Sequence, residues 1–408
     1  MYAKRFIPIL VGTLGLVGCG GRTQGVLVPS GQTLPAGTAV VEMLVSTTRS
    51  DVNSTAGEMF SGERSLVSNY ADITVSIPPD SARTVGDVQW PSKLPADPAK
   101  EFATIKADRI DAKEALSRLH KRIAKTPHRS VLVFVHGYNT RFEDAVYRLA
   151  QIVHDSRAPT LPVLFTWPSR GNVLGYVYDR ESANYSRDAL ENLLRFLAKD
   201  PAVGEITLLA HSMGNWVALE ALRQMSIRDR RIVPKLKHVM LAAPDVDVDV
   251  FRKQIREIGN NRPPFTLIVS QDDKALSISR RVSGNTLRLG AVDPSAEPYK
   301  TEFAKEKLAV IDLTDQKSDD PLNHGKFAES PLVVRMIGQQ IAGQDLHDAR
   351  TNLGESLGLA ASNVAGVVGR ASAIAISAPI AIVDHGTREG LKHQFEDLGE
   401  KLKTPIGR

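Results

Sequence analysis

The chain has 408 residues, and its 51 Lys and Arg against 46 Asp and Glu give a formal net charge of +5. Hydrophobic residues make up 42% of the chain and charged residues 24%, which is typical of a globular protein and excludes collagenous, acidic disordered and polytopic membrane proteins. Basic and acidic residues are interspersed, and no motif that recognises DNA or RNA is present, so we expect no nucleic-acid partner. The single cysteine excludes an intrachain disulfide and zinc sites built on paired cysteines.

Residues 1–18 have the pattern of a secretory signal peptide. Lys4 and Arg5 precede an apolar run over 6–18, which is too short to span a bilayer, since a span needs about 20 residues. The run ends at Cys19 in a sequence that resembles the lipobox of bacterial lipoproteins. This resemblance implies cleavage before Cys19, diacylation of its thiol and a membrane anchor. The alternative is an ordinary signal peptide followed by an incidental cysteine.

The chain after the signal peptide is predicted to consist of a tether, a folded domain and a tail. We expect a flexible tether over 19–38, which is rich in Gly, Pro, Thr and Gln, and one folded domain over 39–343. An Asp in place of Gly20 would indicate inner-membrane retention, so we expect a location in the bacterial cell envelope, with the outer membrane or the periplasmic face favoured. The tail 344–408 is rich in Ala, Gly and Ser, and its apolar piece is too short for a span. Membrane contact, packing on the domain and weak order remain alternatives for this tail.

The domain begins with two predicted strands, over 40–45 and 71–77, and a predicted helix over 101–125. From residue 131 onwards, strands alternate with helices. Further strands are predicted at 131–135, 163–167, 206–209, 238–241, 266–269 and 308–313. Helical spacing of apolar residues marks 142–153, 189–197, 216–222 and 331–341, and 172–185 is a candidate flap. The alternation predicts an α/β fold, with a mostly parallel central sheet and helices on both faces.

Ser212 lies in the strongest candidate for a catalytic motif. The predicted strand 206–209 leads directly into Ala210-His-Ser-Met-Gly214, and a predicted helix follows. In a sharp strand–turn–helix connection only small residues fit two positions either side of the serine. The hydroxyl is then raised above the sheet at a helix N-terminus, where free N–H groups favour developing negative charge. We therefore expect Ser212 to be a nucleophile; the alternative is a structural serine.

A second motif, Val135-His-Gly-Tyr-Asn139, follows the predicted strand 131–135. Negative charge develops on the carbonyl oxygen of an acyl group under attack, and two backbone N–H groups typically stabilise it. We expect the amides of Met213 and Tyr138 to form this oxyanion hole. The alternative is a tight turn in which His136 is a hydrogen-bonded core residue.

A serine nucleophile needs a histidine base, which is itself held by an acid, and in this type of site both follow the serine along the chain. His324 lies after the last predicted strand and before the helix 331–341, which is the expected place for the base. Asp273 and Asp272 follow the strand 266–269, and Asp273 is the favoured acid. Asp272 remains open, as do Asp245 and Asp247 at the end of the preceding strand. For each of these the alternative is a solvated loop carboxylate or a helix N-cap.

Together these segments resemble a known family. The segments that carry the resemblance are His136-Gly-Tyr-Asn139, Phe165-Thr-Trp-Pro-Ser169, Ala210-His-Ser-Met-Gly-Asn215 and Ala243-Pro-Asp-Val-Asp247. They are similar to a bacterial, esterase- or lipase-like branch of the α/β-hydrolase superfamily that is catalogued as a domain of unknown function. The resemblance covers roughly residues 40–340 and implies nucleophile Ser212, acid Asp273 and base His324, without a metal or an organic cofactor. It does not supply a substrate.

The sequence therefore predicts a lipid-anchored serine hydrolase that acts on a small-molecule acyl ester through a covalent acyl-enzyme. Lipid esters and the oligomeric state remain open. An acyltransferase or thioesterase that uses the same three residues is one alternative. A non-catalytic envelope lipoprotein that uses the fold for binding is the other.

Overall fold

The computed structural model describes residues 23–52 and 57–342. The predicted signal peptide, the lipidation of Cys19 and the C-terminal tail fall on residues outside these ranges, and those predictions stay predictions.

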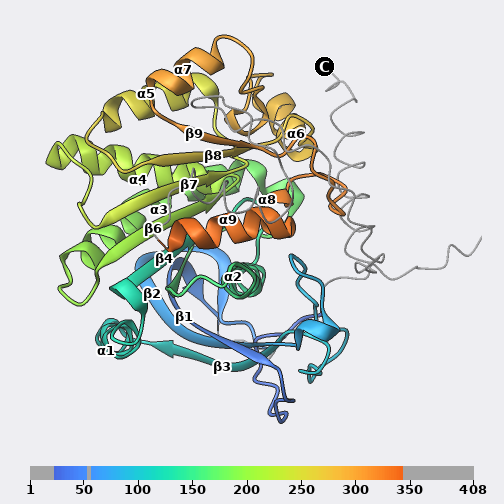
Figure 1. The fold of residues 1–408 in the computed structure, drawn as a ribbon. Helices are drawn as coiled ribbons and strands as arrows, with labels where there is room; N and C mark the ends of the chain where they lie inside the picture. The colour runs from blue at the N-terminus through green and yellow to red at the C-terminus, as the bar shows by residue number, and fades with distance from the viewer. Residues whose placement is uncertain (1–22, 53–56, 343–408) are drawn as a thin grey trace, which may run out of the picture.

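A mixed but mostly parallel sheet runs through the described part of the chain, in the order β3-β2-β1-β5-β4-β6-β7-β8-β9 (Figure 1). Only β2 runs antiparallel to its neighbours; the pairs from β1 through β5 to β9 are parallel. This arrangement confirms the predicted fold class. The strands are β1 (Ala39–Asp51), β2 (Phe60–Ile77), β3 (Ala103–Ile110), β4 (Ser130–Val135), β5 (Leu161–Thr166), β6 (Glu205–His211), β7 (Leu236–Ala242), β8 (Phe265–Val269) and β9 (Ala309–Asp312).

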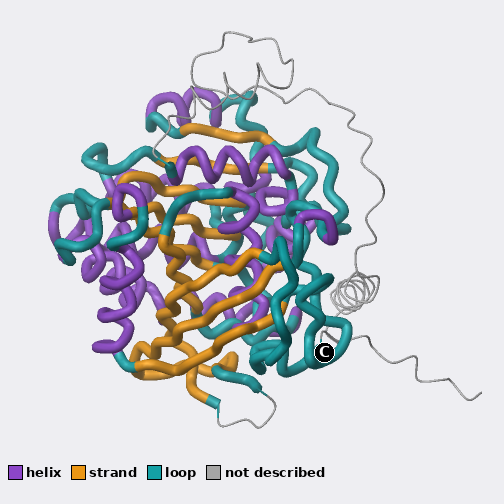
Figure 2. Tube along the Cα trace, turned by 60° about the horizontal axis from the view of Figure 1, so that its bottom comes forward, coloured by secondary structure: helices purple, strands orange, loops and turns teal. Residues whose placement is uncertain are grey.

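Helices cover both faces of this sheet, so that the strands lie between two helical layers (Figure 2). One face carries α1 (Ala112–Ile123), α3 (Tyr176–Lys199), α4 (Gly214–Asp229), α5 (Val248–Ile258) and α7 (Tyr299–Lys305). The other carries α2 (Phe142–Ser156), α8 (Lys326–Glu329) and α9 (Pro331–Ile341). The remaining helix, α6 (Lys274–Val282), follows β8.

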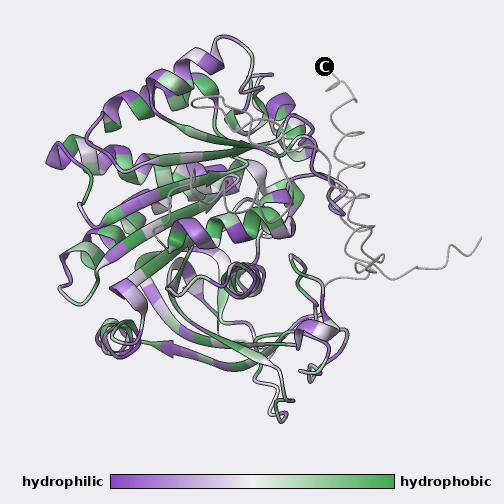
Figure 3. Ribbon diagram, viewed as in Figure 1, coloured by the Kyte–Doolittle hydropathy of each residue, from purple (hydrophilic) through white to green (hydrophobic). Residues whose placement is uncertain are grey.

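The apolar run of β4 shows why both faces need cover. Val131, Val133 and Val135 belong to the core on the α3–α4 side, whereas Leu132 and Phe134 belong to the core under α2 and α9. Successive side chains of a strand point to opposite faces, so a strand that is covered on both sides has to be apolar throughout. Hydrophobic residues accordingly concentrate along the central strands (Figure 3).

One local prediction was wrong. The helix expected over 101–125 is a strand, β3, up to Ile110, and α1 starts only after Asp111, whose side chain accepts a hydrogen bond from the Glu114 N–H. Pairing with the long strand β2 decides the conformation of the first part. The candidate flap 172–185 forms a short 3₁₀ turn followed by the start of α3, and its role as a flap stays a prediction.

The described part of the expected tether contacts the domain. Val26 and Leu27 are buried in the core on the α2 side, and the Tyr147 hydroxyl donates a hydrogen bond to the Val26 carbonyl. The N–H of Ser30 bonds the Thr104 carbonyl of β3. Residues 26–30 are therefore packed on the body rather than free of it. Among the described residues, no helix has the length and apolar character needed to cross a membrane.

Candidate active site

Ser212 forms a sharp turn between β6 and α4. Its φ of +54° places it in the left-handed region, which costs free energy for a residue with a side chain. Hydrogen bonds hold this conformation: the Ser212 N–H donates to the Ala242 carbonyl at 2.9 Å, and the Asn215 side chain donates to the Ser212 carbonyl at 2.9 Å. The strain is therefore supported by β7 and by the first turn of α4.

Two glycines let neighbouring segments approach this turn. A Cβ atom on Gly137 would lie 2.7 Å from Cβ of Ser212, which is closer than such atoms pack. A Cβ atom on Gly214 would overlap the carbonyl oxygen of His136. The loop after β4 thus packs directly against the serine, and this contact requires glycine at both positions.

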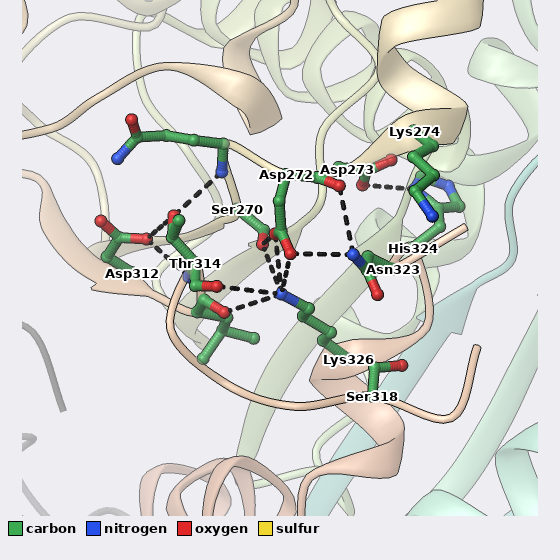
Figure 4. A network of polar contacts seen from close by, with 12 residues as sticks. Ser270, Asp272, Asp273, Lys274, Asp312, Thr314, Ser318, Asn323, His324 and Lys326 are labelled. Atoms are coloured by element: carbon green, nitrogen blue, oxygen red, sulfur yellow. Dashed lines mark hydrogen bonds and ion pairs between the residues drawn. The ribbon is translucent and has the colours of Figure 1, made fainter. Parts of the chain in front are cut away.

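His324 and Asp273 form a direct pair (Figure 4). Nδ1 of His324 lies 2.7 Å from Oδ2 of Asp273, a fully buried side chain that also accepts from the first turn of α6. An ionised carboxylate only accepts hydrogen bonds, so Nδ1 carries the proton and Nε2 is the ring nitrogen left for other contacts. Burial lowers the pKa of His324, but the charge of Asp273 outweighs it and raises the pKa to about 9.

The loop that carries His324 packs against the residue that precedes the serine. The ring of His211, at the end of β6, lies 4.7 Å from the ring of His324 and 4.5 Å from that of Phe327, measured between centroids. Burial, and then the charge of His324, hold the pKa of His211 well below its ordinary value. Ser212, Asp273 and His324 follow β6, β8 and β9, whose carboxyl ends meet at one edge of the sheet.

The other candidate acids have other partners. Asp272 pairs with Lys326 at 2.7 Å, and Asp247 caps the N-terminus of α5. Asp245 accepts from the Ser279 hydroxyl at 2.5 Å and the Tyr176 hydroxyl at 3.2 Å, and lies 3.3 Å from Nε of Arg288. Within the described part of the chain, none of these three carboxylates bonds to His324.

Tyr138 and Met213 flank the serine, one in the loop after β4 and the other at the start of α4. No hydrogen bond from either backbone N–H is found among the described residues. The Tyr138 hydroxyl donates to the Val173 carbonyl, and its ring meets that of Tyr176 edge-on at 5.3 Å. These contacts fix the loop without using the two amides.

His136 is a core residue. Nδ1 lies 2.8 Å from the Gly137 carbonyl and therefore carries the proton, so Nε2 accepts from the Trp167 N–H at 3.2 Å. Its ring stacks on the Trp167 ring at 5.0 Å. Burial and the nearby Arg49 lower the pKa of His136 well below its ordinary value, so the ring is neutral.

Two buried charged residues that the sequence analysis missed hold the loop after β4. Arg49 at the end of β1 is 1% exposed and donates to the carbonyls of Thr140 at 2.7 Å and Ser169 at 2.8 Å. Burial lowers the pKa of Arg49 to about 10. From α3, Asp179 accepts from the Asn139 N–H at 3.2 Å and from the Ser169 hydroxyl at 2.5 Å, and burial raises its pKa. A buried charge at these positions leaves no periodic signal in the sequence.

Within residues 23–52 and 57–342, no three or more His, Cys, Asp or Glu side chains are arranged to hold a metal ion.

Comparisons with known proteins agree with this architecture. The family model described as "Alpha/beta hydrolase of unknown function (DUF900)" matches residues 111–341, which is more than half of the chain. The chain is 28% identical over 133 residues to the uncharacterized protein alr1448 of Nostoc sp. strain PCC 7120, a match that covers 26% of this chain and 34% of that protein. This chain thus spans about a third of the length of that curated relative.

Two of the solved structures to which the chain shows a distant similarity have names that refer to esterases. A lipase-esterase related protein from Clostridium acetobutylicum is 15% identical, with 54% of this chain and 96% of that chain covered and a TM-score of 0.30. The esterase Pf2001 of Pyrococcus furiosus is 10% identical, with 53% and 83% covered and a TM-score of 0.30.

Proposed function

Because the chain belongs to the DUF900 family of alpha/beta hydrolases, we propose that it is a serine hydrolase with Ser212 as nucleophile, His324 as base and Asp273 as the acid that orients the base. The observation that carries this proposal is the hydrogen bond of 2.7 Å between His324 and Asp273, on a loop that packs against the residue before the strained Ser212.

The proposed reaction has two stages. Oγ of Ser212 forms a bond to the acyl carbon while its proton passes to Nε2 of His324. The tetrahedral intermediate collapses, and the alcohol leaves with the proton from His324. Water then attacks the acyl-enzyme, again with His324 taking and returning the proton, and the carboxylic acid is released. Asp273 accepts the hydrogen bond from Nδ1 and fixes the ring, which leaves Nε2 for the reaction.

The backbone N–H groups of Tyr138 and Met213 are the proposed oxyanion hole. Their freedom from hydrogen bonds within the described residues supports this role, because an oxyanion hole needs donors that are already in place. Arg49 and Asp179 hold the loop of Tyr138 from two sides and would keep its amide in position.

Carboxylic esters are the proposed substrate class, because attack by Ser212 on their carbonyl carbon and departure of an alcohol are the two bond changes that the proposed reaction makes. Release of an acid and an alcohol would distinguish hydrolysis from transfer of the acyl group to another acceptor. We also propose that Cys19 carries a lipid anchor that places the enzyme in the bacterial cell envelope. Incorporation of labelled palmitate in wild type but not in Cys19→Ser would test the anchor, and equal labelling of both would refute it.

Hydrolysis of short-chain p-nitrophenyl esters tests the proposed function. Ser212→Ala should reduce turnover to the level of the uncatalysed reaction, whereas Ser68→Ala, which alters an exposed serine of β2, should leave it unchanged. Turnover by Ser212→Ala at the wild-type rate would rule out Ser212 as the nucleophile.

A further inference from the structure

An ion pair between a buried lysine and a partly exposed aspartate lies directly beside the Asp273–His324 pair. Asp272 precedes Asp273, and Lys326 lies two residues after His324, so the same two segments are joined twice. Nζ of Lys326 lies 2.7 and 2.9 Å from the two carboxylate oxygens of Asp272, and the Lys326 residue is only 2% exposed. Figure 4 shows the ammonium group between the ends of β8 and β9.

Further hydrogen bonds make this ion pair the junction of three segments. Lys326 donates to the Leu313 and Thr314 carbonyls after β9, at 3.0 and 3.3 Å, and to the Ser270 hydroxyl after β8 at 3.1 Å. The side chain of Asn323 donates to Asp272 at 2.8 Å. Asn323 and Lys326, on either side of His324 in the chain, thus both bond to Asp272. His324 itself bonds to Asp273.

The ion pair also affects the charge near His324. Asp272 and Asp273 are adjacent carboxylates at the end of one strand, and two uncompensated negative charges so close together would oppose each other's ionisation. Lys326 offsets the charge of Asp272 and leaves Asp273 as the carboxylate that acts on the imidazole. An ion pair with a solvent-exposed partner adds little net stability, so stability alone gives no reason for this one.

We propose that Asp272 and Lys326 act as positioning residues, which hold the loop of His324 and balance the charge around its imidazole. This inference rests on the proposed function for its catalytic meaning, but the charge balance can be measured without catalysis. The titratable or charged groups around His324, from every segment packed against it, are Asp272, Asp273 and Lys274 at α6, Asp320 and Lys326 beside it, His211 at the end of β6, and Asp245 after β7.

The test is an NMR titration of ¹⁵N-labelled histidine in the full chain, with the His324 signals assigned by their loss in His324→Gln. Asp272→Asn leaves a positive charge near the ring, so the pKa of His324 should fall. Lys326→Met leaves a negative charge, so the pKa of His324 should rise. Each change should be roughly half to one pH unit, and the double variant should return close to wild type.

Asp319→Asn is the matched control, because it removes one negative charge from an exposed carboxylate of the same loop and leaves the Asp272–Lys326 ion pair intact. If Lys326→Met fails to fold, the pKa of His324 is compared between Asp272→Asn and Asp272→Glu. Only Asp272→Asn removes the negative charge, so only this variant should lower the pKa. The proposal would be overturned if the pKa of His324 changed in the same direction in both single variants, or did not change in either. Labelling by a fluorophosphonate is measured in parallel: its absence in wild type would refute the serine hydrolase and leave the titration result standing.

Discussion

Asp273 holds His324 through Nδ1 at 2.7 Å, and its own side chain is fully buried at the start of α6. The next carboxylate along the chain, Asp272, points to Lys326 instead, and Asp245 at the end of the neighbouring strand points to Ser279 and Arg288. These three carboxylates therefore have different partners, and the role of each can be tested by substitution.

Asp273→Asn should lower kcat far more than Asp245→Asn. An asparagine at 273 no longer fixes the tautomer of His324 or stabilises the imidazolium, and we expect a loss of roughly 10³- to 10⁴-fold. Asp245→Asn instead leaves Arg288 without its buried partner, so it should cost roughly 3 kcal/mol of stability and much less kcat. Ester turnover and urea unfolding of both variants check this. A larger loss of kcat in Asp245→Asn than in Asp273→Asn would show that the catalytic acid follows β7 and not β8.

The activity should rise with pH up to about 9. The base must be neutral to accept the Ser212 proton, and the pKa of His324 is raised to about 9, so its neutral fraction grows about tenfold per pH unit below that value. The measurement is kcat/KM against pH between 6 and 10, corrected for spontaneous hydrolysis. A profile that is already flat at pH 7 would contradict the raised pKa of the base.

Gly137→Ala should impair catalysis without unfolding the protein. The new Cβ atom would lie 2.7 Å from Cβ of Ser212, so either the serine or the loop of Tyr138 must shift. A displacement of this size at reacting groups lowers kcat by roughly 100-fold. Gly175→Ala is the control, because its Cβ atom would have ordinary contacts of 3.5 Å and its φ is −80°. Equal activity of the two variants, each folded by circular dichroism, would show that the close approach is unimportant.

Arg49→Met should reduce both stability and kcat. It leaves the Thr140 and Ser169 carbonyls without their buried donor, and each unsatisfied group costs about 1–3 kcal/mol. The loop of Tyr138 also loses one of its two supports, so kcat should fall while KM changes less. Urea unfolding and steady-state kinetics check this, with Arg231→Met, at an exposed arginine after α4, as control. An unchanged kcat in a destabilised Arg49→Met would limit this residue to a structural role.

The alternation of apolar strands and amphipathic helices after residue 131 was enough to predict the mostly parallel sheet, because strands buried on both faces, such as β4, are apolar throughout. The N-terminal half was harder. The segment 103–110 alternates apolar and polar residues over 103–108, a strand pattern that the helix prediction over 101–125 overlooked, and it pairs with β2 at the edge of the sheet. Long-range pairing also decides that residues 26–30 pack on the body.

The small residues around Ser212 were predictable, because a sharp turn imposes them on the sequence. Asp273 was the favoured partner of His324, but the other carboxylates stayed open, since the choice between Asp272 and Asp273 depends on which side chain turns toward the loop after β9. Arg49, Asp179 and Lys326 were missed, because each interacts with carbonyls and side chains distant in sequence. The catalytic roles of Ser212, His324, Asp273 and the two amides remain predictions.

Peptide mapping after fluorophosphonate labelling tests the central claim most directly, because it locates the nucleophile and its dependence on the base in one measurement. The account predicts a single phosphonylated residue, Ser212, in the wild-type protein and a rate of modification at least 100-fold lower in folded His324→Gln. An adduct at another residue, no adduct at all, or modification of Ser212 in His324→Gln at the wild-type rate would contradict it.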